Sequence, residues 1–452
     1  MTRVVVVGGG IAGLTTALHL KDAGLNVLLL EARGTLGGNI STDRTDGWII
    51  ERATNGYVDN ASATEHLVDR LGLRGRVRKA NERAAKRFLY RSGRLHPLPT
   101  NPLRFVGSRV LSPIGRLRVV LEPFFARRAR ENKDRTVYEF ARSHIGHEAA
   151  TVLVDAMVSG IFAGDIHQLS LASTFPKMAL MEAKYRSLVR AMLDRRRDTA
   201  GGPAGPAGTL TSFDDGLDVL IAALGEALGD SVRVATPVAA IQRGNPWEVA
   251  TESGDTIGAD AVVLATPAWA ASRLLAKTDP SISEILAAIR SAGLAVVALG
   301  YDTAAVGGEP DGFGFLVPRN QGLRTLGCLW DSSLFPGRAP TAKVLLRVMI
   351  GGAHDADAVG LDDAALLDIA RRELGSTMRI TAAPVMSRIY RHTRGIAQYT
   401  VGHRSRIEAI ERRLHSAMKG IWLAGSSYYG VSMNACIAKA GVQAAEISRA
   451  LS

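Results

Sequence analysis

The sequence contains very little cysteine. Its 452 residues include two, Cys328 and Cys436, and these lie far apart and form no CxxC pair. We therefore expect neither a disulfide framework nor a thiolate metal site. One histidine pair, His144 and His147, has the i, i+3 spacing of metal ligands. Because no neighbouring carboxylate or third ligand stands out, we interpret the pair as part of a partly exposed helix and expect no metal.

Long apolar runs and nucleic-acid motifs are also absent from the sequence. No run of about 18 uncharged apolar residues is present, which argues against a membrane-spanning helix. The strand-like "RVVVVGGG" begins at Arg3 with no leader before it, which favours a cytoplasmic protein. The net charge of +12 suits nucleic acid, anionic lipid or an acidic substrate. We do not expect the protein to bind nucleic acid, because no zinc-finger or RNP-like motif accompanies the charge.

The sequence has enough apolar residues, 46%, to bury a large core, and its length predicts two or three domains. Residues 2–31 predict a strand, a glycine turn, a helix and a second strand. Their apolar runs are nearly continuous, as in a parallel sheet that is buried on both faces. Strand-like segments return at 231–241, 258–267 and 420–427, before a helix from about Asn434. The predicted sheet is therefore assembled from distant parts of the chain.

Two stretches differ from this pattern. Residues from about 102 to 198 look mainly helical and are rich in arginine, and a flexible loop follows at 199–208. From about 276 to 401 the sequence changes to short strand-like runs, which predict a second, mostly antiparallel unit.

The first glycine motif predicts a dinucleotide site. Gly8, Gly10 and Gly13 have the G-x-G-x-x-G spacing, and Ile11 and Ala12 open the helix between them. The first glycine permits a tight turn, the second lets the backbone approach a pyrophosphate, and the third lets helix and strand pack closely. Glu31 follows the next strand, at the distance of a carboxylate that binds a ribose, with Ala32 beside it.

A glycine pair, Gly37 and Gly38, follows the ribose-binding strand. We expect the chain to turn back toward the pyrophosphate here, where a side chain would collide with the cofactor. This E-x5-GG pattern resembles that of the flavoproteins with two dinucleotide-binding domains, in which it marks FAD rather than NAD. A simple surface turn is the alternative interpretation.

The same resemblance extends to the middle and the end of the chain. Gly425 follows a strand and Gly430 precedes a helix, with Val431 and Met433 just after Gly430, so a second helix N-terminus can face the phosphates. Val238 and Thr266 match, respectively, a valine that binds adenine through its backbone and a strand-end motif. The resemblance implies one noncovalently bound FAD per chain.

Longer stretches resemble a narrower family, the oxygen-dependent porphyrinogen oxidases of haem biosynthesis. The matching stretches are "AAKRFLYRSGRLHPLP", "SGIFAGDIHQLSLASTFP", "GFGFLVP", "RVMIGG", "QYTVGHRSRI" and "GVSMNACI". The resemblance implies oxidation of protoporphyrinogen IX to protoporphyrin IX, or of coproporphyrinogen III to coproporphyrin III. Oxygen is then the acceptor, and each of three rounds releases hydrogen peroxide.

The family resemblance also implies the substrate-binding residues. Arg87 matches an arginine that binds a propionate, while Gly160 and Gly164 match a loop that borders the substrate cavity. Four further residues match positions that line the macrocycle: Phe313, Gly314, Leu316 and Met349. A surface arginine or a structural ion pair is the alternative for Arg87, and plain core packing is the alternative for the apolar residues. We assign no catalytic side chain, because FAD carries the redox step.

Together these patterns predict an α/β fold. An FAD-binding Rossmann-like domain would comprise residues 1–85, 208–275 and 402–452. A mixed α+β substrate-binding domain would comprise 86–101 and 276–401, and a helical insert would comprise 102–207.

Arginines of the insert are interleaved with apolar residues, as suits an anionic membrane surface. These arginines are Arg104, Arg109, Arg116, Arg118, Arg127, Arg128 and Arg130. An ordinary solvated basic face is the alternative. We therefore expect a cytoplasmic protein that can bind the inner face of the cell membrane. The sequence leaves open handover of the product to the next haem-pathway enzyme, and whether the protein is a monomer or a homodimer.

Two other functions remain open at this point. A flavin amine oxidase shares the glycine pair, and Tyr428 and Tyr429 could form an aromatic cage for an amine. A porphyrin-binding flavoprotein without turnover is the second alternative.

Overall fold

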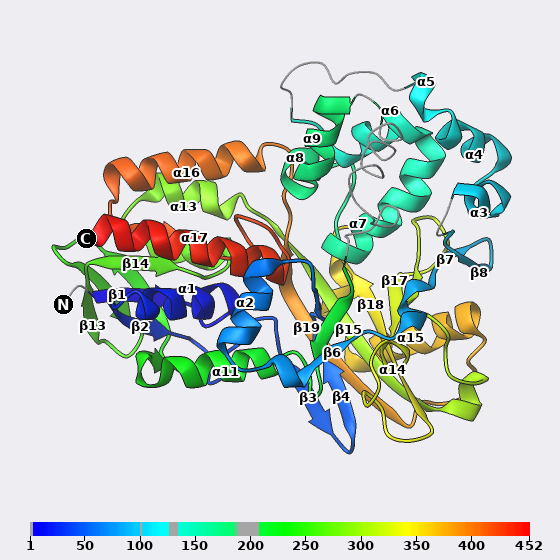
Figure 1. Cartoon of the computed structure of the whole chain (residues 1–452), viewed down its shortest axis with the longest axis horizontal. Helices are drawn as coiled ribbons and strands as arrows, with labels where there is room; N and C mark the ends of the chain where they lie inside the picture. The colour runs from blue at the N-terminus through cyan, green and yellow to red at the C-terminus, as the bar shows by residue number, and fades with distance from the viewer. Residues whose placement is uncertain (1–2, 100–101, 126–133, 186, 188–207) are drawn as a thin grey trace.

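The computed structural model describes residues 3–99, 102–125, 134–185, 187 and 208–452 (Figure 1). The loop predicted at 199–208 and Arg127, Arg128 and Arg130 therefore lie, apart from Gly208, outside the described residues.

A five-stranded parallel sheet forms the centre of the part on the left of Figure 1. Its order is β10 (Val232–Arg233), β2 (Asn26–Leu30), β1 (Arg3–Val7), β14 (Ala261–Leu264) and β20 (Ile421–Leu423). The four valines of β1 are at most 4% exposed, because layers of structure cover both faces of the sheet. The predicted assembly of this sheet from distant segments is confirmed, but of the stretch predicted at 231–241 only β10 joins it, and the end of that stretch lies in a separate sheet.

Each face of this sheet has its own core. On one face pack α1 (Ile11–Asp22), α11 (Val219–Leu228) and α17 (Met433–Leu451). On the other lie a small sheet of β11 (Val238–Gln242), β12 (Trp247–Thr251) and β13 (Thr256–Ala259), and three helices, α12 (Ala268–Leu275), α13 (Pro280–Ala287) and α16 (His403–Ala417).

A seven-stranded sheet forms the second centre. Its order is β19 (Met386–Ala397), β15 (Ser291–Asp302), β18 (Lys343–Gly351), β17 (Thr325–Trp330), β16 (Gly314–Leu316), β7 (Arg87–Arg91) and β8 (Arg94–Pro97). Neighbouring strands are antiparallel except β16 and β7, which are parallel. Residues 87–97 therefore join the sheet formed by residues 291–397, while the exact domain boundaries stay a prediction.

The two faces of the seven-stranded sheet are covered differently. Helix α15 (Asp363–Met378) packs on one face. A hairpin of β3 (Thr42–Thr45) and β4 (Trp48–Glu51) packs on part of the other face, where Trp48 and Ile50 contact Val296 and Leu345. The rest of that second face is turned toward the helices at the upper right of Figure 1.

Those helices form the insert. Its described helices are α3 (Pro102–Gly107), α4 (Pro113–Val120), α5 (Glu122–Phe125), α6 (Val137–Ala149), a π-turn (Ala150–Val154), α7 (Asp155–Phe162), α8 (Leu171–Thr174) and α9 (Pro176–Tyr185). Pro123 lies in the first turn of α5, which a proline tolerates. The prediction of a mainly helical insert holds for these residues.

Smaller elements complete the described fold. They are β5 (Tyr57–Val58), α2 (Ser62–Arg70), β6 (Val77–Lys79), β9 (Leu210–Phe213), α14 (Asp331–Leu334) and the 3₁₀ turns Arg74–Arg76, Glu82–Ala85, Gly229–Ser231, Thr303–Val306 and Ala356–Gly360.

One helical run of the insert, Val137–Phe162, is long and apolar enough to cross a membrane by length and composition. Its interior argues for packing within the protein instead. The backbone leaves helical geometry at Gly146. The buried carboxylate of Asp155 pairs with Arg319, and buried His144 pairs with two carboxylates. Such paired ionisable groups are typical of a helix within a folded protein.

His144 and His147 lie on a partly exposed helix, as expected, but His144 belongs to its buried side. Its side chain is 1% exposed, with Nδ1 2.7 Å from Glu122 and Nε2 2.9 Å from Glu182. Both glutamates come from other helices, so neither was visible from the local sequence. His144 therefore joins α5, α6 and α9, whereas His147 is exposed.

A buried charged network joins the β3–β4 hairpin to the seven-stranded sheet. Arg347 of β18 is 1% exposed, and its guanidinium contacts both carboxylate oxygens of Asp331. It also donates to the carbonyl of Glu51 at 2.6 Å and to Oδ1 of Asn55 at 2.6 Å. Arg347 thus fixes the hairpin that follows the glycine pair against the seven-stranded sheet.

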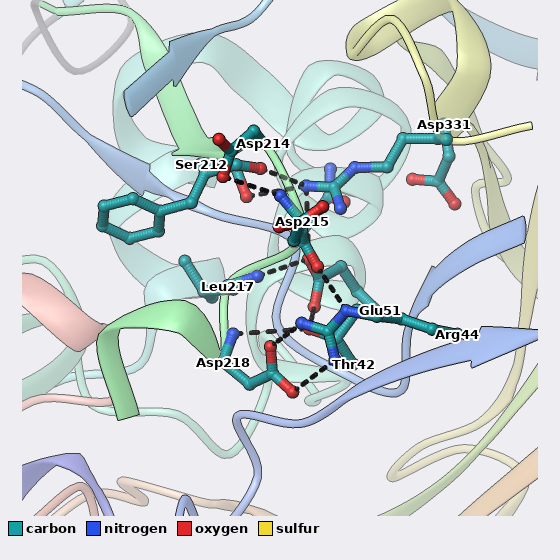
Figure 2. Close-up of polar contacts among 12 residues, drawn as sticks. Thr42, Arg44, Glu51, Ser212, Asp214, Asp215, Leu217, Asp218 and Asp331 are labelled. Atoms are coloured by element: carbon teal, nitrogen blue, oxygen red, sulfur yellow. Dashed lines mark hydrogen bonds and ion pairs between the residues drawn. The ribbon is translucent and has the colours of Figure 1, made fainter. Parts of the chain in front are cut away.

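The Glu51 side chain extends this network to Leu217, which lies just before α11 and packs in the core on one face of the parallel sheet. Figure 2 shows its carboxylate beside Thr42 and Leu217: Oε2 accepts from the Thr42 hydroxyl at 2.8 Å, and Oε1 accepts from the Leu217 N–H at 2.8 Å. Arg338 lies 3.3 Å from Oε1. Burial raises the pKa of Glu51, and Arg338 acts in the opposite direction.

We predict that Asp331→Asn destabilises the protein by about 3 kcal/mol, because it leaves the buried Arg347 without its charged partner. Denaturant unfolding of wild type and variant measures this difference. As a control, Asp368→Asn removes a carboxylate that is 69% exposed and pairs with Arg372 on the surface of a helix. The control should change stability by less than about 1 kcal/mol. Equal effects of the two variants would contradict the importance of the buried pair.

Candidate functional site

The three glycines of the first motif have three different surroundings. Gly8 has φ +112°, and a Cβ there would lie 2.8 Å from the carbonyl oxygen of Ala265. A Cβ on Gly13 would lie 2.0 Å from the Gly8 carbonyl oxygen, so only glycine lets helix and strand pack here. A Cβ on Gly10 would meet nothing nearer than Gly38 Cα, at 3.9 Å. The protein itself leaves space at Gly10, as a bound pyrophosphate requires.

Glu31 lies beside this loop, directly after β2. Its Oε2 accepts a hydrogen bond from the Gly9 N–H at 2.7 Å, and its Oε1 accepts one from the Arg33 N–H at 2.9 Å. A carboxylate oxygen has more than one acceptor position, so ribose hydroxyls can still bind. The carbonyl of Glu31 accepts from Thr236, which brings Val238, at the start of β11, close to Glu31 and Ala32.

The glycine pair packs on the first glycine loop. The Gly37 N–H donates to the Gly9 carbonyl at 2.8 Å, and a Cβ on Gly38 would lie 3.3 Å from Gly10 Cα. A Cβ on Gly37 would lie 2.2 Å from the carbonyl oxygen of Ile40, and both glycines have positive φ. The sequence attributed these glycines to close approach of a cofactor. The structure shows a further reason, which is close approach of the chain to itself, while approach of the cofactor stays a prediction.

The last glycine motif lies beside the first. A Cβ on Gly425 would be 3.8 Å from the Cβ of Ala12, so the starts of α1 and α17 lie close to each other. Ser432 caps α17 through its hydroxyl, between the partly buried Val431 and the buried Met433. Between the two loops lies Thr266, whose Oγ1 is buried without a hydrogen-bond partner among the described residues.

These features fit a dinucleotide at the carboxyl edge of the parallel sheet. Gly10 leaves open space, Thr266 offers an unused hydroxyl, and two helix N-termini face the same region. We therefore place the predicted cofactor residues here: Gly8, Gly10, Ile11, Ala12, Gly13, Glu31, Ala32, Gly37, Gly38, Val238, Thr266, Gly425, Val431 and Met433.

The strand register brings most of the predicted substrate residues to one face of the seven-stranded sheet. Arg87 pairs with Gly314. Two residues further along both strands, and therefore on the same face, Leu89 pairs with Leu316. This row of paired residues continues from Leu316 through Gly327 to Met349. Side chains of paired residues point to the same side of a sheet. This is the face that the β3–β4 hairpin leaves partly uncovered.

Arg87 is an exposed cation on this face. Its guanidinium lies 4.9 Å from the ring centroid of Phe313, and it forms no ion pair with any described residue. Partial desolvation lowers the pKa of Arg87, which stays cationic at neutral pH. A structural ion pair, one alternative for this arginine, is therefore not present among the described residues.

Helix α7 lies opposite the sheet face. A Cβ on Gly160 would be 2.7 Å from Leu316 Cδ2, so the helix approaches the sheet closely at this glycine. Met157 and Ile161 share the face of Gly160 by their spacing and are 39% and 49% exposed. The sequence analysis missed both, although their i, i+3, i+4 spacing with Gly160 could have indicated an apolar wall.

One predicted substrate residue is placed differently from expectation, and a second is partly covered. Gly164 is buried, and a Cβ there would lie 2.7 Å from both Gln398 Oε1 and Leu169 Cδ1. It therefore packs within the protein rather than bordering a cavity. Met349 is partly buried and packs against the core beneath the hairpin.

The segment after the glycine pair contacts the edge strand of the seven-stranded sheet. Asn39, which follows the glycine pair, donates to the carbonyl of Gly395 in β19 at 3.0 Å. Two hollows of the described surface lie away from the sheet face that carries Arg87. One is on α16, around Glu411 and His415, and the other is beside Trp330 and Met378. A wide apolar cavity over the cofactor therefore stays a prediction.

Tyr428 and Tyr429 do not form the open aromatic cage considered above. Tyr428 is 3% exposed and donates its hydroxyl to the Thr266 carbonyl at 3.1 Å. The Tyr429 hydroxyl donates to Glu411 at 2.8 Å. With both hydroxyls bound within the protein, these rings are parts of the core.

Comparison with known proteins gives consistent results. The chain is 32% identical to the coproporphyrinogen III oxidase of Bacillus subtilis (strain 168), over 96% of this chain and 95% of that protein. It is also 32% identical to the protoporphyrinogen oxidase of Homo sapiens, over 98% and 97% of the two chains. A crystal structure from Exiguobacterium sp. 255-15 superposes with a TM-score of 0.86 at 28% identity, covering 99% of both chains.

More distant structures share the fold alone, such as the cyclohexylamine oxidase of Brevibacterium oxydans IH-35A, with a TM-score of 0.72 at 18% identity over 100% of this chain and 99% of that one. The model of the family described as flavin containing amine oxidoreductase matches residues 11–448. That match and the dinucleotide site identify the cofactor as FAD. The chain therefore belongs to the flavin-containing amine oxidoreductase family.

Proposed function

We propose that this chain is an FAD-dependent porphyrinogen oxidase of haem biosynthesis. Its reaction would be the six-electron oxidation of protoporphyrinogen IX to protoporphyrin IX, with three O₂ reduced to three H₂O₂. Oxidation of coproporphyrinogen III to coproporphyrin III by the same route is the alternative. Of the two relatives at 32% identity, one is named coproporphyrinogen III oxidase and the other protoporphyrinogen oxidase. FAD, when bound, supplies the electron acceptor for this chemistry.

The observation that carries the substrate class is the position of Arg87. Its guanidinium is exposed and has no ion-pair partner among the described residues. It lies over the ring of Phe313, on the sheet face on which Leu316 approaches α7. A porphyrinogen combines a large apolar macrocycle with propionate side chains. Arg87 would bind a propionate, and Phe313, Gly314, Leu316 and Gly160, with Met157 and Ile161, would contact the ring.

Two other functions are supported less well. An amine substrate would be repelled by the cationic Arg87, and the buried Tyr428 offers it no cage. A carrier without turnover would bind a porphyrinogen but would not oxidise it. Anaerobic bleaching of the flavin on addition of a porphyrinogen separates the proposed enzyme from both.

We predict that Arg87→Ala lowers kcat/KM about 10- to 150-fold, because a hydrogen bond to a charged group contributes about 1.5–3 kcal/mol. Arg87→Lys should recover part of this loss, since it keeps the charge but not the planar fork of donors. Steady-state kinetics with both porphyrinogens measures the effect.

The neighbouring Lys86 provides the control. It is an exposed cation that pairs with Asp311, so Lys86→Ala should leave kcat/KM within about twofold, as expected for a surface pair. FAD content and thermal stability should stay unchanged in all three variants. A folded Arg87→Ala enzyme with normal kcat/KM would remove Arg87 from the substrate site.

We predict that turnover consumes about three O₂ and releases about three H₂O₂ per porphyrin formed, since removal of six electrons requires three two-electron steps. An oxygen electrode, a peroxide assay and porphyrin absorbance on one sample measure the ratio. A ratio of one would rule out the six-electron scheme. Rates with the two porphyrinogens compared at equal concentration decide which one is preferred.

We further propose that the protein is cytoplasmic and binds the inner face of the cell membrane through its insert. Exposed apolar side chains gather on α3, α4 and α5, and we call them the insert patch: Val106, Ile114, Leu117, Val120, Phe124 and Phe125. Ile114 and Phe124 are 80% and 81% exposed. Arginines of the same helices could contact anionic headgroups. Handover of the product to a following enzyme, and a monomeric or homodimeric state, stay open within this proposal.

We predict that the protein sediments with anionic vesicles at low salt and that binding weakens as salt rises, because charges are screened over about 10 Å at 0.1 M. The double variant Ile114→Glu with Phe124→Glu should lose this binding, since two charges would enter the apolar layer. Val385→Glu, at a residue that is 52% exposed elsewhere, is the control and should bind normally. Unchanged binding of the double variant would refute the role of the insert patch.

A further inference from the structure

The loop between β20 and α17 is held by side chains from another part of the chain. Tyr399, which follows β19, is 2% exposed. Its hydroxyl donates to the carbonyl of Ser426 at 2.6 Å and accepts from the N–H of Gly430 at 2.7 Å. One hydroxyl therefore joins the beginning and the end of this loop. Both contacts satisfy backbone groups that the turn leaves without partners in a helix or sheet.

His403 holds the middle of the same loop. Its ring stacks on that of Tyr399, with centroids 4.0 Å apart and an interplanar angle of 12°. Its Nε2 lies 3.2 Å from the carbonyl of Tyr428. Burial lowers the pKa of His403 to about 4, with a smaller opposing effect from the contact with Tyr428, so the ring is neutral at pH 7. The neutral tautomer with the proton on Nε2 donates to Tyr428.

The far side of the loop faces the cofactor region. The backbone N–H groups of Gly425 and Val431 donate no hydrogen bond to any described residue. Gly425 also lies opposite Ala12, at the start of α1. The loop therefore combines a fixed inner side with free donors near the phosphate-binding helix.

Tyr399 also belongs to the junction of the three parts of the molecule. Its own carbonyl accepts from the N–H of Ser170 in the insert at 2.8 Å, and Thr400 forms a bridge with Leu169. Strand β19 of the seven-stranded sheet ends at Ala397, two residues before it.

We propose that Tyr399 is a positioning residue for FAD: through its hydroxyl, with His403 stacked behind it, it holds the loop from Gly425 to Gly430 in the shape that binds the cofactor. This inference rests on the FAD site described above. It assigns to the Gln398–His403 segment a role in cofactor affinity, although the segment lies between the substrate sheet and α16 and carries no glycine motif.

Tyr399→Phe tests this role, because it keeps the ring and the stack and removes the hydroxyl. Apoprotein of wild type and variant is titrated with FAD, and flavin fluorescence reports binding. The loss of two hydrogen bonds should weaken FAD affinity about tenfold or more. The thermal midpoint of the apoprotein should change little, so a general loss of stability can be told from a loss of cofactor affinity.

Two further variants complete the experiment. Tyr301→Phe removes the hydroxyl of another buried tyrosine, 1% exposed in β15, and should leave FAD affinity unchanged. His403→Phe keeps a stacked ring and removes the donor to Tyr428, so it should weaken FAD binding in the same direction. If Tyr399→Phe does not fold, the FAD affinity of His403→Phe tests the positioning role instead.

The outcomes separate the inference from the proposed function. Wild-type apoprotein that does not bind FAD would refute the cofactor site itself. Wild-type binding together with an affinity within twofold for both Tyr399→Phe and His403→Phe would overturn the positioning role. A fall of the apoprotein midpoint with unchanged FAD affinity would show that Tyr399 is structural only.

Discussion

One buried guanidinium joins the hairpin that follows the glycine pair to the seven-stranded sheet. Arg347 lies in the middle of β18, and its donors are shared between Asp331, the Glu51 carbonyl and Asn55. A cation removed from water in this way needs every one of these partners. Because Glu51 ends the hairpin that follows Gly37 and Gly38, the same contacts join the segment after the glycine pair to the sheet that carries Arg87.

The dinucleotide half of the site could be predicted from the sequence because its requirements are local. Gly8 and Gly13 are needed by a turn and by a packing contact that lie within a few residues of each other, and the spacing alone reveals them. The reason for Gly37 and Gly38 could not be predicted. Those glycines approach Gly9 and Gly10, and the sequence does not state which segments touch.

The partners of buried charged groups could not be predicted from the sequence. Arg347 stands in an apolar strand, but its partner Asp331 and its acceptor Asn55 come from other elements. His144 similarly acquires Glu122 and Glu182 only when three helices pack together. For the substrate face, strand pairing places Arg87 beside Gly314, whereas Gly164 is buried against Gln398 and Leu169.

The order of the strands in the parallel sheet has a consequence for how the protein is made. The first two strands, β1 and β2, leave the ribosome early, whereas β20 pairs with β14 at the opposite edge and comes after every other strand of that sheet. Gly425 and the start of α17 follow β20 immediately. The nascent chain thus carries an unfinished nucleotide pocket through most of its synthesis. Cofactor capture is consequently a late event, and the stability that a bound ligand confers on the native state becomes available only near the completion of translation.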